Sequence, residues 1–196
     1  MATRSSAYPL GAYPRKVTLR DGTEVVLKPM VAEDRDALLK FFQLIPAADR
    51  YYLRDDVASP QVIDRWAREL DYDRVLPLLA WVGTRIVADG TLHRQRAGGR
   101  QHIGELRLVV DPEHRQRGVD TAIIHDLVSM VHGSLLERVF MEVVAEGEGQ
   151  AVEALQWLGF RKLAVLPRYA RNMDGRVHDV VIYDLSLDNW LDRSPG

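Results

Sequence analysis

The sequence predicts an α/β (α+β) domain in which helices flank one central sheet in three layers. Segments rich in Leu, Ile and Val alternate with segments whose apolar residues recur at helical spacing. The order is a hairpin, two helices and three consecutive strands, followed by a helix, a strand, a helix and two final strands. A chain of 196 residues is long enough to bury one substantial core. We therefore expect a single domain with a mixed, mostly antiparallel sheet.

Turn and capping residues define the individual elements. The Asp21-Gly22 pair predicts a tight hairpin turn, and Ser59-Pro60 combines an N-cap residue with a proline at the first helical position. Gly159 is expected to end the last helix. The expected strands are 17–20, 23–28, 76–82, 85–93, 102–110, 139–145, 160–169 and 177–187, and the expected helices are 32–44, 59–70, 121–131 and 150–158.

Both ends of the chain are expected to lie outside the domain. Residues 1–16 contain Pro9 and Pro14 and lack an apolar run of signal-peptide length, so they predict a flexible N-terminal tail. The closing stretch 191–196 predicts a short C-terminal tail. The single domain is expected to cover 17–190.

The composition excludes several classes of protein. Without cysteine there is no disulfide framework, no thiolate metal ligand and no thiol nucleophile, and this usage fits a cytoplasmic protein. The longest apolar stretch, 75–82, has eight residues, against about 20 for a membrane-spanning helix. A net charge of -2 argues against a dedicated nucleic-acid binder, and the six histidines show no metal-ligand spacing. We expect neither a nucleic-acid partner, nor a membrane, nor a metal.

The segment 109–121 joins an apolar strand to the start of a helix and is the most informative part of the sequence. Backbone N–H groups at a helix N-terminus lack intrahelical partners and lie at the positive end of the helix dipole, so they bind anions. Gly118 allows an anion to approach the backbone closely, and Arg115 and Arg117 add positive charge beside it. The junction therefore predicts a phosphate site.

This loop resembles the pyrophosphate loop of the GNAT superfamily, the acyl-CoA-dependent N-acyltransferases. The family pattern is Arg or Gln, two residues, Gly, one residue, and Gly or Ala. Arg115 and Gly118 match the first two positions, whereas Asp120 replaces the small residue at the third. The resemblance extends over 17–187, because the lead-in from Val110 to Pro112 and the later helices follow in the family order.

Two further segments resemble one subgroup of this superfamily. Residues 19–29 and 49–54 are similar to the catalytic domains of bacterial protein-lysine acetyltransferases and their small-substrate relatives. The resemblance implies a GNAT-like fold and an N-acetyltransferase that uses acetyl-CoA as co-substrate. The acceptor would be a primary amine of a small molecule or of a protein lysine, while the oligomeric state, including a homodimer, stays open. The residues that the resemblance assigns to the cofactor are Leu108, Val109, Val110, Arg115, Gln116, Arg117, Gly118, Val119, Asp120 and Thr121.

Acetyl transfer also needs a proton acceptor, because a lysine-like amine has a pKa of about 10.4 and reacts only when neutral. Glu105 resembles the glutamate that related family members use as the base, and the resemblance makes it the candidate catalytic residue. Strand alternation places Glu105 on the same face as Arg107. An ordinary surface ion pair is therefore the second interpretation.

Asp120 also allows two interpretations. If its carboxylate faces a phosphate at about 4 Å, the repulsion is on the order of 4 kcal/mol before screening. If it turns away from the phosphate site, it stabilises the helix start by roughly 0.3–1 kcal/mol. Leu155 stands where many family members carry a tyrosine that protonates the leaving thiolate. These two departures keep a second function open, a non-catalytic regulatory or binding protein on the same fold.

Overall fold

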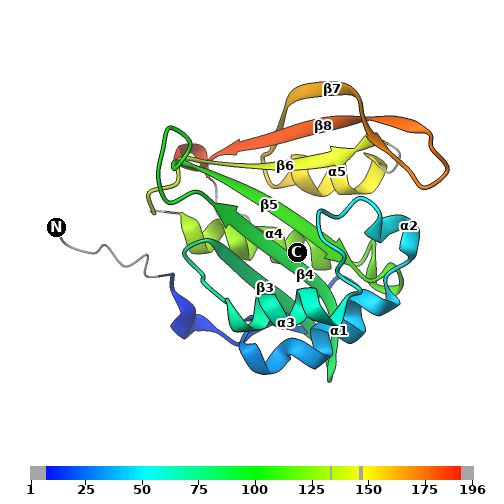
Figure 1. Cartoon of the computed structure of the whole chain (residues 1–196). Coiled ribbons are helices and arrows are strands. Elements are labelled where there is room, and N and C mark those ends of the chain that lie inside the picture. Colours follow the sequence, from blue (N-terminus) through cyan, green and yellow to red (C-terminus); the bar gives the residue numbers. More distant parts are fainter. Residues whose placement is uncertain (1–7, 133, 146–147, 191–196) are drawn as a thin grey trace.

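The computed structural model describes residues 8–132, 134–145 and 148–190 (Figure 1). Eight strands of this part of the chain form one sheet: β1 (Arg15–Thr18), β2 (Glu24–Pro29), β3 (Val75–Val82), β4 (Arg85–Arg94), β5 (Ile103–Val110), β6 (Arg138–Val144), β7 (Arg161–Arg171) and β8 (Val177–Ser186). Their order across the sheet is β1-β2-β3-β4-β5-β6-β8-β7. Neighbouring strands are antiparallel except β5 and β6, which are parallel. The mixed, mostly antiparallel sheet is confirmed.

Helices cover both faces of this sheet (Figure 1). One face carries α1 (Arg35–Leu44) and α3 (Pro60–Arg68), with the short α2 (Ala47–Arg50) between them in sequence. The other face carries α4 (Val119–Val131) and α5 (Glu148–Trp157). Single 3-10 turns lie at Leu10–Ala12, Ala32–Asp34, Pro112–His114 and Leu187–Asn189. The three-layer architecture agrees with the sequence prediction, and none of the described helices is both long and apolar enough to span a membrane.

Strand alternation divides the core between the two faces of the sheet. Leu78 and Leu106 are buried against α4, whereas Leu79 and Ile86 are buried against α1 and α3. The helix α4 packs closely on β4 at Gly90, where an added Cβ atom would lie 2.1 Å from Cγ2 of Ile123. A residue without a side chain is required there because packed interiors leave no such space.

The element boundaries differ from the prediction at two places near the candidate site. The helix expected from residue 121 begins at Val119, so Asp120 lies in its first turn. The helix expected over 32–44 begins as the 3-10 turn Ala32–Asp34 and becomes α-helical at Arg35. The expected tails at residues 1–7 and 191–196 lie outside the described residues.

Residues 8–16, expected as part of the N-terminal tail, pack against the domain. Tyr8 is 8% exposed, and β1 begins at Arg15. The buried carboxylate of Asp126 on α4 accepts a hydrogen bond from the Tyr13 hydroxyl at 3.0 Å and one from Arg15 Nε at 2.9 Å. The expectation fails here because these contacts join residues more than a hundred positions apart in the sequence.

We predict that Asp126→Asn destabilises the protein by about 2 kcal/mol, because it breaks a largely buried ion pair whose arginine can still reach water. Burial raises the pKa of Asp126, but hydrogen bonds from His125, Arg15 and Tyr13 outweigh it and hold the pKa below its ordinary value. The ionised carboxylate therefore adds stability above its unfolded-state pKa, and this contribution is lost as the pH falls through the folded-state pKa.

Urea unfolding of both proteins at neutral and acidic pH measures this difference. Asp36→Asn is the control, because the Asp36 side chain is 77% exposed and its pair with Arg35 contributes little. Equal midpoints for Asp126→Asn and the native protein at neutral pH would contradict the assignment.

Candidate functional site

A gap opens in the middle of the sheet where β5 and β6 diverge (Figure 1). These strands pair only from Ile103 to Glu105 on β5 and from Arg138 to Phe140 on β6. The amide of Asp111 donates to the carbonyl of Val87 at 2.9 Å, so the N–H groups of alternate residues face β4. The N–H groups of Leu108 and Val110 therefore face the gap. Two of the predicted cofactor residues thus present main-chain groups at an unpaired strand edge.

The loop after β5 leads from this gap to the N-terminus of α4. Gly118 is the N-cap of α4 and has a φ of 90°, a left-handed conformation that glycine adopts without steric cost. Gln116 also has a positive φ, of 64°. The first bond within the helix runs from the Ala122 amide to the Gly118 carbonyl at 3.0 Å. The amides of residues 118–121 therefore precede the helical hydrogen-bond ladder, as an anion site requires.

Acidic side chains form ion pairs with Arg115 and Arg117, the two arginines of this loop that are expected to bind phosphate. Arg115 donates from Nε to the Val110 carbonyl at 3.1 Å and from Nη2 to Asp49 at 2.6 Å. Arg117 lies 3.3 Å from Asp21. Both arginine side chains are more than two-fifths exposed, and such surface ion pairs contribute about 1 kcal/mol or less.

The Asp120 carboxylate accepts a hydrogen bond from the amide of Thr121 at 2.8 Å. This contact stabilises the helix start without turning the carboxylate away from the expected phosphate site, so it combines the two interpretations that the sequence left open. It also occupies one of the four amides at the helix start. Val119 contributes an amide to the same turn, while its side chain is buried in the core.

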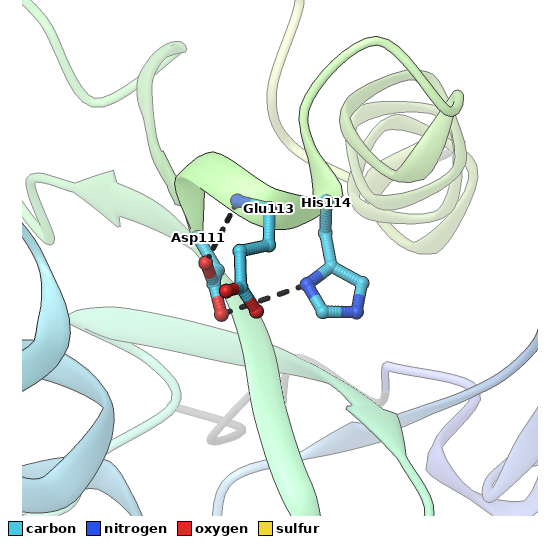
Figure 2. Close-up of side chains that lie close together, drawn as sticks. All are labelled: Asp111, Glu113 and His114. Atoms are coloured by element: carbon cyan, nitrogen blue, oxygen red, sulfur yellow. Dashed lines mark hydrogen bonds and ion pairs between the residues drawn. The ribbon is translucent and has the colours of Figure 1, made fainter.

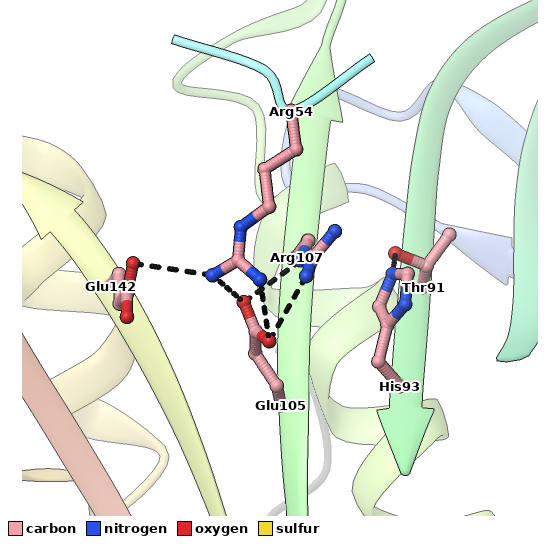
Figure 3. Close-up of polar contacts among 6 residues, drawn as sticks. All are labelled: Arg54, Thr91, His93, Glu105, Arg107 and Glu142. Atoms are coloured by element: carbon pink, nitrogen blue, oxygen red, sulfur yellow. Dashed lines mark hydrogen bonds and ion pairs between the residues drawn. The ribbon is translucent and has the colours of Figure 1, made fainter. Parts of the chain in front are cut away.

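Glu105, the candidate base, lies on β5 between two arginines (Figure 3). Arg107 donates to its two carboxylate oxygens at 2.8 Å and 3.0 Å, and Arg54 donates to them at 2.8 Å and 3.4 Å. Arg54 also lies 3.5 Å from Glu142 on β6, so it bridges the two diverging strands. The pair of Glu105 with Arg107 that alternation predicted is present.

The charges around Glu105 determine its protonation state. Burial raises the pKa of Glu105, but the hydrogen bonds and positive charge of Arg107, together with the charge of Arg54, hold it below its ordinary value. The carboxylate is therefore ionised at neutral pH, and its oxygens are already occupied by guanidinium groups.

A pocket of about 470 Å³ lies beside the gap, under α1 and α3. Leu108 and Val109 line it, so the pocket and the strand gap share β5. Phe42 and Trp66 form an edge-to-face aromatic contact in its wall, with ring centres 6.1 Å apart. Arg54 and Arg107, the partners of Glu105, also line the pocket.

The sequence analysis missed two polar residues of this pocket, Asp89 and His93 on β4. Asp89 is 6% exposed, and burial raises its pKa to about 7. Burial and the nearby charge of Arg107 lower the pKa of His93 to about 4, and its Nε2 atom lies 2.9 Å from the Thr91 hydroxyl (Figure 3). The sequence pattern that could have identified Asp89 is an acidic residue directly after three apolar residues of an expected strand, Ile86, Val87 and Ala88.

Asp111, Glu113 and His114 form a second polar cluster, at the start of the loop (Figure 2). One potential ligand atom of each lies within 4.8 Å of the others, although the sequence spacing suggested no metal site. Asp111 accepts a hydrogen bond from the Glu113 amide at 3.0 Å and lies 3.3 Å from Arg85. These contacts cap the 3-10 turn Pro112–His114 and give the cluster a role in shaping the loop.

Solved acetyltransferases share this architecture. The acetyltransferase of GNAT family from Streptococcus pneumoniae superposes with a TM-score of 0.73 at 17% identity, over 83% of this chain and 98% of its own. The GNAT domain of S. lividans PAT gives 0.70 at 20% identity, over 88% and 96%. Mycobacterium smegmatis RimJ, in complex with CoA-disulfide, gives 0.67 at 21% identity, over 90% of each chain. No family model and no curated protein matches the sequence. The chain has the fold of the GNAT acetyltransferases.

Proposed function

We propose that the protein transfers an acetyl group from acetyl-CoA to a primary amine. The observation that carries this proposal is the strand gap that leads directly to the start of α4, where the amides of residues 118–120 precede the helical hydrogen-bond ladder. An extended arm can add to the free edge of β5 through main-chain hydrogen bonds, as peptides do at exposed sheet edges. A diphosphate then reaches the amides of residues 118–120. The solved structure of RimJ with CoA-disulfide supports this choice of co-substrate.

The main chain of β5 would support the reaction itself. The amine nitrogen attacks the thioester carbon, a C–N bond forms, and the C–S bond breaks to release CoA as a thiolate, which takes up a proton from solvent. Negative charge develops on the carbonyl oxygen, and the Leu108 N–H facing the gap donates to it. The proton lost by the amine goes to a carboxylate, for which Glu105 remains the sequence-based candidate. The adjacent pocket would hold the acceptor.

Two measurements test the function directly. Calorimetric titration with acetyl-CoA should give a saturable binding isotherm, and an assay of free thiol should detect release in the presence of amines or lysine peptides. Absence of both signals would reject the proposal. Acetyl-CoA binding without thiol release across the amine and peptide panels would instead support the non-catalytic binding protein.

Glu105→Gln tests the base. If Glu105 takes the proton, we expect kcat to fall by about 100-fold while the affinity for acetyl-CoA stays unchanged. Glu142→Gln is the matched control, because Glu142 also pairs with Arg54 but lies on β6. A similar loss of kcat in both variants would mean that Glu105 only holds Arg54 in place.

Asp120 should weaken CoA binding, because its negative charge lies at the helix start and its carboxylate occupies the Thr121 amide. We predict that Asp120→Asn and Asp120→Ala both bind CoA about tenfold more tightly, which corresponds to about 1.4 kcal/mol. Titration at low and high salt should show the gain shrinking with ionic strength. Asp188→Asn, an exposed acid on the turn after β8, is the control. Unchanged or weaker CoA binding by both Asp120 variants would contradict this interpretation.

A further inference from the structure

Asp89 is a buried carboxylate in the pocket lining, and no described residue forms an ion pair with it. It is 6% exposed, it lines the pocket, and its Oδ1 atom has no hydrogen-bond partner among the described residues. Its neighbours across the strands are Leu79 on β3 and Val109 on β5, both apolar. A polar group in such surroundings costs free energy unless something donates a hydrogen bond to it.

The charged residues elsewhere in the pocket differ from Asp89 because several have partners. Arg65 lies 3.3 Å from Asp55, and Arg54 and Arg107 both bind Glu105. The remaining charged residues of the lining are Glu69, Asp71 and Arg74, from the segment between α3 and β3. Asp89 therefore differs as a carboxylate of the lining with no ion-pair partner among the described residues, and its Oδ1 atom is almost completely shielded from solvent.

Beside these charged residues, part of the pocket lining is apolar and aromatic. Met30, Leu38 and Phe42 are almost fully buried, and Trp66 stands edge-on to Phe42 at an interplanar angle of 77°. Such walls bind a hydrocarbon or aromatic body, and aromatic faces also attract cations. An ammonium group brings three N–H donors and a positive charge opposite the Asp89 carboxylate. An alcohol brings one donor and no charge.

We propose that the pocket binds an amine with an apolar body and that the Asp89 carboxylate is the counter-ion of its ammonium group. The role of this amine as acetyl acceptor rests on the proposed function. Its binding to the pocket does not require acetyl-CoA. The inference concerns binding and holds whichever carboxylate later takes the proton. It favours small apolar amines over long, flexible polycations as acceptors.

Protonation of Asp89 gives the binding a pH dependence with a defined sign. With a pKa of about 7, the ionised fraction of Asp89 rises about tenfold from pH 6 to pH 8, while an aliphatic ammonium keeps its proton. His93, the histidine of the lining, has a pKa of about 4 and stays neutral over this range. The affinity for an amine should therefore rise about tenfold from pH 6 to pH 8.

Calorimetry on the full chain without acetyl-CoA tests the inference, with phenethylamine as the probe and phenethyl alcohol as its neutral analogue. Asp89→Asn keeps the shape of the side chain and removes its charge. We expect this variant to bind the amine at least tenfold more weakly and without the pH dependence. Asp36→Asn, which removes an exposed acid outside the pocket lining, should change the affinity less than twofold.

A measurement on the native protein does not depend on the folding of any variant. Binding of phenethylamine at pH 7, repeated in buffers of different ionisation enthalpy, should release about half a proton, because Asp89 is then about half protonated. Equal binding of the alcohol and the amine, native affinity in Asp89→Asn, or no proton release would each overturn the inference. If the protein binds acetyl-CoA but not the amine, the inference about the pocket is wrong and the proposed function stands. If it binds the amine but not acetyl-CoA, the proposed function is wrong and the inference about the pocket stands.

Discussion

The divergence of β5 from β6 is the constraint on which the rest of the candidate site depends. Past Glu105, β5 continues along β4 as far as Val110, while β6 continues along β8 as far as Val144. The strand β5 keeps its hydrogen bonds to β4, and β6 keeps its hydrogen bonds to β8. The separation therefore costs main-chain hydrogen bonds only on the edges that face the gap. Those unsatisfied main-chain groups are what an extended ligand can use. In a fully paired sheet, Leu108 and Val110 would have no groups to offer.

Charge compensation is the second organising feature. Arginines approach the gap and the phosphate loop from several elements, and acids face them: Asp21 with Arg117, Asp49 with Arg115, and Glu105 with Arg54 and Arg107. The near-neutral total charge hides this local pairing. Asp89 differs because burial and not a neighbouring charge sets its pKa. Perturbed carboxyl groups in a pocket are typical of sites that handle protons or cations.

The local parts of the fold and site were predictable from the sequence. Gly118 and the apolar residues after it predicted the start of α4 to within two residues, and alternation predicted that Glu105 faces Arg107. Both depend on neighbours in the chain. The burial of Asp89 was not predictable, because it results from α1 and α3 covering β4. The contact of Tyr13 with Asp126 was missed for the same reason, since its partners come from distant segments.

Arg54 has a consequence for how two ligands would communicate. Its guanidinium joins Glu105 and Glu142 across the diverging strands, while the segment that carries it forms part of the pocket wall through Leu53, Asp55 and Val57. A molecule that separates Arg54 from either carboxylate also releases one tether of that wall. If that molecule changes the affinity of the pocket for its own ligand, thermodynamic reciprocity requires that the pocket ligand changes binding between the strands by the same factor. Arg54 is the side chain that contacts both places, and the order in which they fill changes the route but not the total free energy.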